Sequence, residues 1–408
     1  MSERSLRQVL DYLGRFGGFG RDARLLLALG FFISITIGLS DMTLPLYLRS
    51  LGYSPDVIGL MLGTSAFTSF VVLLPAGILA DHYGNKRVLI MSILAYSCGF
   101  AVYATLAAFQ FLLVASILIG FSWGSYIGPW NAILAERSRD EDRSYVFSFN
   151  SFLSALGVFA GYILGGSTET LGLILQLSTE GVFRNMFFAA FLSALVCLTM
   201  LCVLREKSVP RPRQRVLQIT SWRFIGFLSV VNILIGFGAG TLIPLLPLYL
   251  SVKFLATEAS IGVLLASSSV TTGVANLLAP RLSEKIGDIA TITLTQCAAI
   301  LPLILIPYSG AFPISATLYV IRTTLMNMSS PTMSTYTVNG LSKEERASAL
   351  GLTTMSWNGA YAIGTTVSGA MISVNLDLPI CNSAAFYTLS SVLFYCGARR
   401  LRQMSTSS

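Results

Sequence analysis

Apolar residues recur along this chain in runs of about 20, separated by short polar stretches. As an α-helix, a run of that length crosses the roughly 30 Å hydrocarbon core of a bilayer. Open strands could not satisfy their backbone hydrogen bonds in lipid, so we predict an all-α integral membrane protein. The twelve expected transmembrane helices are 25–48, 57–80, 88–108, 111–134, 145–166, 184–204, 224–250, 259–281, 289–309, 312–336, 347–372 and 381–398.

The two halves of the chain resemble each other. The pentapeptide LPLYL occurs at 44–48 and again at 246–250, an offset of 202 residues. The Ile-Gly pair at 58–59 recurs at 261–262, an offset of 203. A repeat this long indicates two equivalent six-helix bundles and not a short-period solenoid. Because each half has an even number of spans, the halves are parallel repeats related by an axis along the membrane normal. The expected domains are an N-terminal arm (1–23), two bundles (24–204 and 223–402), a linker (205–222) and a tail (403–408).

Composition and charge fix the class and the orientation. Hydrophobic residues make up 54% of the chain, charged residues 11%, and mean hydropathy is +0.71, outside the range of soluble domains. Of the 27 Lys and Arg residues, 23 fall on the side that holds both termini and the linker. The positive-inside rule therefore predicts cytoplasmic termini, and we expect a plasma-membrane location. This asymmetry accounts for the net charge of +8, which gives no reason to expect a nucleic-acid partner.

The loop between the second and third spans carries a spaced set of glycines and charges. Its members are Gly77, Asp81, Gly84, Lys86 and Arg87. The set resembles the signature loop of the major facilitator superfamily, which lies between the same two spans. That resemblance implies the two-bundle fold of the family and a cytoplasmic latch formed by this loop. The second half keeps a partial copy, with Glu284 and Gly287 at an offset of 203 residues but without the basic pair.

The fifth span carries Gly157, Gly161 and Gly165 at four-residue spacing. This segment is similar to the antiporter motif of drug–proton exchangers, with Tyr162 where that motif has proline, and it implies a 12-span antiporter-like member. A stripe of small residues that lets two helices pack closely is the alternative interpretation. In the fourth span Ser116 stands where such antiporters usually carry an arginine, so proton coupling through that arginine does not transfer.

Two charged residues fall within the expected spans, Asp41 and Arg322. Each costs about 2.5–3.5 kcal/mol on an insertion scale at a helix centre, and such residues are functional by default. We predict that Asp41 is the proton-coupling residue and that Arg322 binds substrate. A static ion pair between the two is the alternative. Neither charge is repeated in the other half, because Asp41 corresponds to Ile243 and Arg322 to Gly120.

Aromatic and amide side chains gather on several expected spans, in a pattern that suits an apolar binding site with a few orienting polar groups. The further substrate-binding candidates are Trp123, Tyr126, Trp130, Asn131, Asn150, Asn232, Trp357, Asn358 and Tyr361. For each residue alone, aromatic packing or a hydrogen bond between helices is the alternative explanation.

These features favour secondary active transport of a small organic solute by alternating access, with proton-coupled efflux of amphipathic compounds as the leading hypothesis. Uptake or exchange of an organic anion or a sugar-like metabolite is the alternative within transport, and a nontransporting membrane sensor is the alternative outside it. The single histidine and the absence of a nucleophile motif or metal-ligand spacing disfavour an enzyme, a metal site and a cofactor. We expect a monomer in the lipid bilayer.

Overall fold

The computed structural model describes residues 19–139, 142–204, 221–342 and 345–406, and every regular element in these ranges is a helix. Most of the expected N-terminal arm, residues 205–220 of the linker and the last two residues of the tail lie outside the described residues. The first bundle contains α2 (Arg21–Ser50), α3 (Pro55–Tyr83), α4 (Asn85–Thr105), α5 (Phe109–Arg137), α6 (Arg143–Gly166), α7 (Thr168–Leu175) and α8 (Thr179–Val203). The second contains α9 (Trp222–Leu242), α10 (Leu246–Lys253), α11 (Glu258–Ile286), α12 (Asp288–Leu305), the 3-10 turn η2 (Ile306–Tyr308), α13 (Phe312–Asn339), α14 (Arg346–Val374) and α15 (Leu378–Thr406).

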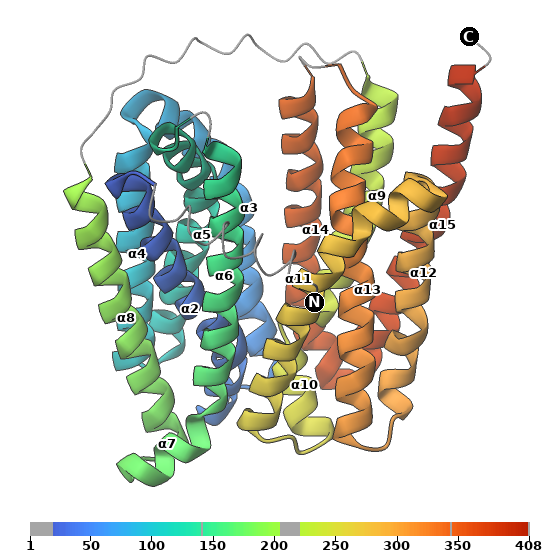
Figure 1. Cartoon of the computed structure of the whole chain (residues 1–408). Helices are drawn as coiled ribbons and strands as arrows, with labels where there is room; N and C mark the ends of the chain where they lie inside the picture. The colour runs from blue at the N-terminus through green and yellow to red at the C-terminus, as the bar shows by residue number, and fades with distance from the viewer. Residues whose placement is uncertain (1–18, 140–141, 205–220, 343–344, 407–408) are drawn as a thin grey trace, which may run out of the picture.

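Each of the twelve expected spans corresponds to a long helix or, for 224–250, to a broken one, and the prediction of an all-α membrane fold is confirmed. By length and composition, nine helices of the described residues can cross a membrane. The helices α13, α14 and α15 are also long but are not among these nine. Figure 1 shows the two bundles standing side by side.

Two elements differ from the sequence prediction. The expected span 224–250 is divided into α9 and α10, with a break at residues 243–245. Pro244 lies in the break and has no counterpart in the first half, where Met42 occupies the same place and α2 continues through Pro45. Because proline lacks a backbone N–H and crowds the preceding turn, the extra proline explains the interruption. The short helix α7 was not predicted, and its Leu173 is 78% exposed.

Within each half, glycines allow two helices to pack backbone against backbone. A Cβ atom added to Gly161 of α6 would lie 2.2 Å from the carbonyl oxygen of Ile35 in α2. The second half repeats this between α9 and α14, where a Cβ on Gly240 would lie 2.2 Å from the carbonyl oxygen of Tyr361. Close helix packing therefore accounts for the spacing of the glycines in α6, and an antiporter role of this segment stays a prediction.

The two halves meet at the end of the bundles opposite the linker, which we call the distal end. There Gly59 of α3 faces Gly369 of α14, and Gly262 of α11 faces Gly166 of α6. A Cβ atom on Gly59 would lie 2.7 Å from the Cα of Gly369, and one on Gly262 would lie 2.9 Å from the Cα of Gly166. The two contacts are repeats of each other, since 203 residues separate Gly59 from Gly262 and Gly166 from Gly369.

The linker end of the same helices is less crowded. A Cβ atom added to Gly77 of α3 or to Gly351 of α14 would meet no atom within 4 Å. In Figure 1 the ribbons of the two bundles converge at the distal end and stand farthest apart at the linker end. The halves are thus closed against each other at the distal end.

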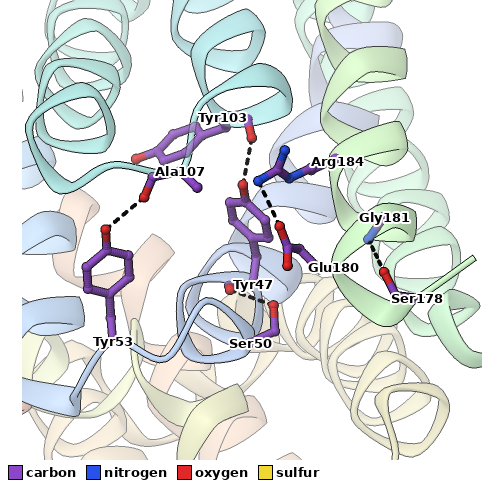
Figure 2. A network of polar contacts seen from close by, with 9 residues as sticks. All are labelled: Tyr47, Ser50, Tyr53, Tyr103, Ala107, Ser178, Glu180, Gly181 and Arg184. Atoms are coloured by element: carbon purple, nitrogen blue, oxygen red, sulfur yellow. Dashed lines mark hydrogen bonds and ion pairs between the residues drawn. The ribbon is translucent and has the colours of Figure 1, made fainter.

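The distal end of the first half is held together by a polar network (Figure 2). The hydroxyl of Tyr47, the tyrosine of the first LPLYL, donates a hydrogen bond of 2.9 Å to the backbone oxygen of Tyr103 in α4. Next to it, Arg184 and Glu180 of α8 form an ion pair with a distance of 2.7 Å. The hydrogen bond joins the distal ends of α2 and α4, and the ion pair lies within α8 beside it.

The second LPLYL has an equivalent arrangement. The hydroxyl of Tyr249 donates to a carboxylate oxygen of Asp377 at 2.9 Å, and Lys253 forms an ion pair with the same oxygen at 2.5 Å. Between the halves, Arg49 donates to the hydroxyl of Ser251 at 3.0 Å. Every cation on this side of the described structure is therefore paired with a polar group.

Candidate functional site

Asp41 lies in the distal third of α2 and at the meeting of the two halves. Protein atoms surround it deeply, yet its side chain remains accessible to solvent. Its carboxyl group is close enough to interact electrostatically with the hydroxyls of Tyr162 in α6 and Tyr361 in α14, which belong to different halves. Within the described residues, no charged side chain acts on it. Asp41 is thus an accessible carboxyl group without a cation.

Arg322 lies in α13 and is only 2% exposed. Its guanidinium donates a 2.6 Å hydrogen bond to the hydroxyl of Tyr387 in α15, and its carbon atom lies 5.1 Å from the centre of the same ring. A weaker contact of 3.5 Å reaches the hydroxyl of Thr323. Among the described residues, no carboxylate pairs with Arg322, and its Nε has no hydrogen-bond partner. Within that part of the chain, the ion pair between Asp41 and Arg322 considered above does not form.

A series of interacting tyrosines connects these two charged groups. Tyr162, Tyr319 and Tyr361 interact electrostatically with one another, and Tyr387 joins them next to Arg322. Of these, only Tyr361 was a sequence-based candidate for the site. Tyr319 could have been found, because it precedes Arg322 by three residues on the same helix face. Tyr387 had no such signal, because its span was not expected to contribute.

The aromatic candidates of the first half divide into two groups. Trp123 and Tyr126 line a cleft among α2, α4 and α5, together with Tyr96. Trp130 stacks on Tyr126 with ring centres 5.3 Å apart, but it is only 5% exposed and packs against Gly30 of α2. Trp130 is therefore a packing residue in this structure, whereas Trp123 and Tyr126 are partly exposed and line a narrow cleft.

In the second half, Trp357 and Tyr361 of α14 stack with ring centres 4.8 Å apart. Because Tyr361 also interacts electrostatically with Asp41, this stacked pair belongs to the same group of interacting side chains as the carboxyl group. The pair and Asp41 come from different halves, so the structure brings together candidates more than 300 residues apart in the chain.

The amide candidates are less convincing. Asn232 and Asn358 each donate to a carbonyl oxygen four residues earlier in their own helix, at 2.9 Å. Asn150 lies against Gly30, and its buried Oδ1 has no hydrogen-bond partner among the described residues. Asn131 is exposed and follows the buried Trp130. No contact of the described residues joins these amides to Asp41 or Arg322, and their role in binding stays a prediction.

The latch loop adopts the same backbone in both halves. Gly84 and Gly287 have φ angles of 91° and 84°, which favour glycine because it has no side chain. Lys86 donates to the backbone oxygens of Cys202, at 3.2 Å, and of Leu204. These bonds tie the loop to its own half, near the end of α8. A role of the loop in joining the two halves stays a prediction.

Comparison with known proteins identifies the family. Residues 26–226 and 228–403 match the model of the Major Facilitator Superfamily. The chain belongs to this superfamily. The family and its structural neighbours are transporters, so the chain is a multi-pass membrane transporter and not an enzyme.

The chain is similar to named relatives and to solved structures. The chain is 20% identical to the quinolone resistance protein NorA of Staphylococcus aureus over 357 residues, covering 86% of this chain and 89% of NorA. It is 27% identical over 164 residues to the class C tetracycline resistance protein of Escherichia coli, covering 39% of this chain and 41% of that protein. A crystal structure of the nucleoside transporter NupG aligns with a TM-score of 0.75 at 15% identity, covering 92% of this chain and 98% of NupG. A D-xylose–proton symporter aligns with a TM-score of 0.73 at 14% identity, covering 92% and 96%.

Proposed function

We propose that this protein is a proton-coupled exporter of small organic solutes, located in the plasma membrane with both termini in the cytoplasm. The observation that carries the proposal is the position of Asp41. An accessible carboxyl group without a cation, set where the two halves meet, can take up and release a proton as access alternates. Ionisable groups within a membrane span mark proton and substrate pathways.

The arrangement of the two halves supports alternating access. They touch through the glycine pairs at the distal end, and that end faces outward if the termini are cytoplasmic. The structure then represents a state that is closed to the outside. In a transporter built from two repeats, rocking of one half against the other opens the opposite side.

The direction of transport rests on the relatives. NorA and the class C tetracycline resistance protein are named for resistance to antibacterial compounds, which is consistent with export. The structural neighbours include a nucleoside transporter and a sugar–proton symporter, so uptake is the competing direction. An experiment that imposes the proton gradient in either direction separates the two.

The test uses purified protein in lipid vesicles, a fluorescent quinolone as solute, and an imposed pH gradient. Wild-type protein should move the quinolone in the direction opposite to the flow of protons down the imposed gradient. Asp41→Asn should lose this gradient-driven component while still exchanging quinolone across the membrane at equal pH, because the amide cannot carry a proton. Asp288→Asn is the matched control, since Asp288 lies at the linker end and accepts a hydrogen bond from the hydroxyl of Ser283. If Asp41→Asn keeps its full response to the pH gradient, Asp41 is not the coupling residue.

A further inference from the structure

The buried guanidinium of Arg322 has no anionic partner among the described residues and is met only by neutral hydroxyls and the face of the Tyr387 ring. Its hydrogen-bond partners are the neutral hydroxyls of Tyr387 and Thr323, and its Nε is unpartnered within the described chain. A buried charge is normally paired, because the loss of hydration is otherwise uncompensated. The geometry therefore leaves an anion-binding capacity that the described protein does not use.

The neighbouring phenol groups add hydrogen-bond donors to that capacity. The hydroxyls of Tyr162, Tyr319 and Tyr361 make no hydrogen bond with any described residue, although Tyr319 is only 4% exposed. A phenol hydroxyl can donate one hydrogen bond, and a carboxylate accepts several. The guanidinium and these hydroxyls together match the oxygen atoms of an anionic group.

Asp41 supplies the opposite charge on the other half. It interacts with Tyr162 and Tyr361, and Tyr361 in turn interacts with Tyr387 beside Arg322. The titratable groups that act with Asp41 come from α4, α6 and α14, and they are the tyrosines Tyr96, Tyr162 and Tyr361. One unpaired carboxylate and one unpaired guanidinium are thus connected through interacting tyrosines and do not pair with each other.

We propose that the transported solute is an organic zwitterion, whose anionic group binds Arg322 and the free tyrosine hydroxyls while its cationic group binds Asp41 in exchange for a proton. The proposal rests on the proton-coupled transport proposed above and names its substrate class. The cationic group and the proton compete for one carboxylate, as export against proton entry requires. An anion alone would favour proton binding at Asp41 and would couple the two movements in the same direction.

The two charged groups that would bind the solute stand apart from each other. Asp41 and Arg322 belong to different halves, and no charged side chain of the described residues acts on Asp41. A solute that binds both groups therefore contacts both halves at once. A rigid aromatic zwitterion would also contact the stacked Trp357 and Tyr361.

Three matched ligands test the proposal: a piperazinyl quinolone with a carboxylate and an amine, its methyl ester, and its N-acetyl derivative. The ester lacks the negative charge, and the N-acetyl derivative lacks the positive one. Binding is measured through the thermal stabilisation of the purified protein, which grows with ligand occupancy. Wild-type protein should bind the zwitterion about 10- to 100-fold more tightly than either derivative, the range expected for one charge-assisted hydrogen-bonded contact.

The variants assign each charge to its partner. Arg322→Gln should lower the affinity for the zwitterion to that for the ester, and it should leave the affinity for the ester unchanged. Asp41→Asn should lower the affinity for the zwitterion to that for the N-acetyl derivative. Arg322→Lys keeps a charge without the planar fork and should fall between wild type and Arg322→Gln. Arg399→Gln is the control, because Arg399 also lies over a tyrosine ring, that of Tyr395, but near the linker end.

Equal binding of the three ligands by wild-type protein would overturn the proposal, even if every variant failed to fold. An equal loss of affinity for the zwitterion and for the ester in Arg322→Gln would also overturn it, since a purely structural arginine affects the binding of all ligands alike. Retained proton coupling in Asp41→Asn would instead refute the proposed function, while the discrimination by Arg322 against the ester would still stand.

Discussion

Closure at the distal end depends on glycine at four positions, and Gly59→Ala tests this dependence directly. The added methyl group would lie 2.7 Å from the Cα and 2.8 Å from the nitrogen of Gly369. Both neighbours are backbone atoms, so no flexible side chain can turn aside. Gly59 and Gly369 belong to different halves, and the clash is relieved when the halves separate at this end.

Overpacking of a well-packed contact typically costs about 1–3 kcal/mol. Because the cost falls only on the state in which the distal end is closed, it shifts the balance between states. The population should move about 5- to 150-fold toward the state that is open at the distal end. Gly262→Ala should act in the same direction, since its methyl group would lie 2.6 Å from the carbonyl oxygen of Tyr162.

The assay measures the distance between spin labels on cysteines that replace Leu173 and Leu255, in a protein whose six native cysteines have been removed. These leucines are 78% and 85% exposed, lie near the distal end and belong to different halves. Gly59→Ala should lengthen the mean distance. Gly226→Ala should not, because a Cβ there meets no atom within 4 Å. An unchanged distance in folded Gly59→Ala would refute the closure argument.

Two further predictions concern stability. Asp377→Asn should lower the free energy of unfolding by about 0.2–1 kcal/mol, the range for a partly exposed ion pair, and the loss should shrink in a Lys253→Met background. Thermal unfolding of the single and double variants in detergent checks this, and additive effects would argue against the pair. Gly161→Val should reduce the yield of monodisperse protein, because even its Cβ would lie 2.2 Å from the carbonyl oxygen of Ile35. Gly128→Val should be tolerated, since nothing lies within 4 Å, and equal yields would contradict the packing argument.

Much of the fold follows from the sequence because the bilayer imposes it. A span must be helical and about 20 residues long, so apolar run length is sufficient to locate helices. The departures come from local chemistry that run length does not record. Pro244 divides α9 from α10 although the surrounding residues are apolar throughout. The helix α7 is only 8 residues long, too short to register as a span.

The candidate site could be predicted only in part. Asp41 and Arg322 were identified because charge within a span is rare and costly. Of the tyrosines around them only Tyr361 was identified, because residues such as Tyr162 and Tyr387 lie on helices distant in sequence. The repeat marked Gly59 and Gly262 as equivalent positions, but no sequence pattern indicates that each closes on a glycine of the other half.

The hydrogen bond between Arg49 and Ser251 joins residues 202 positions apart, the same offset that separates the two LPLYL segments. Two residues related in this way can touch only next to the local twofold axis. In a dimer of identical subunits, the axis would bring each residue against its own copy, and two arginines there would repel each other. A single chain with two halves is free of that constraint and can place a donor on one side of the axis and an acceptor on the other. The same freedom allows a carboxylate in α2 and a guanidinium in α13, each without its duplicate.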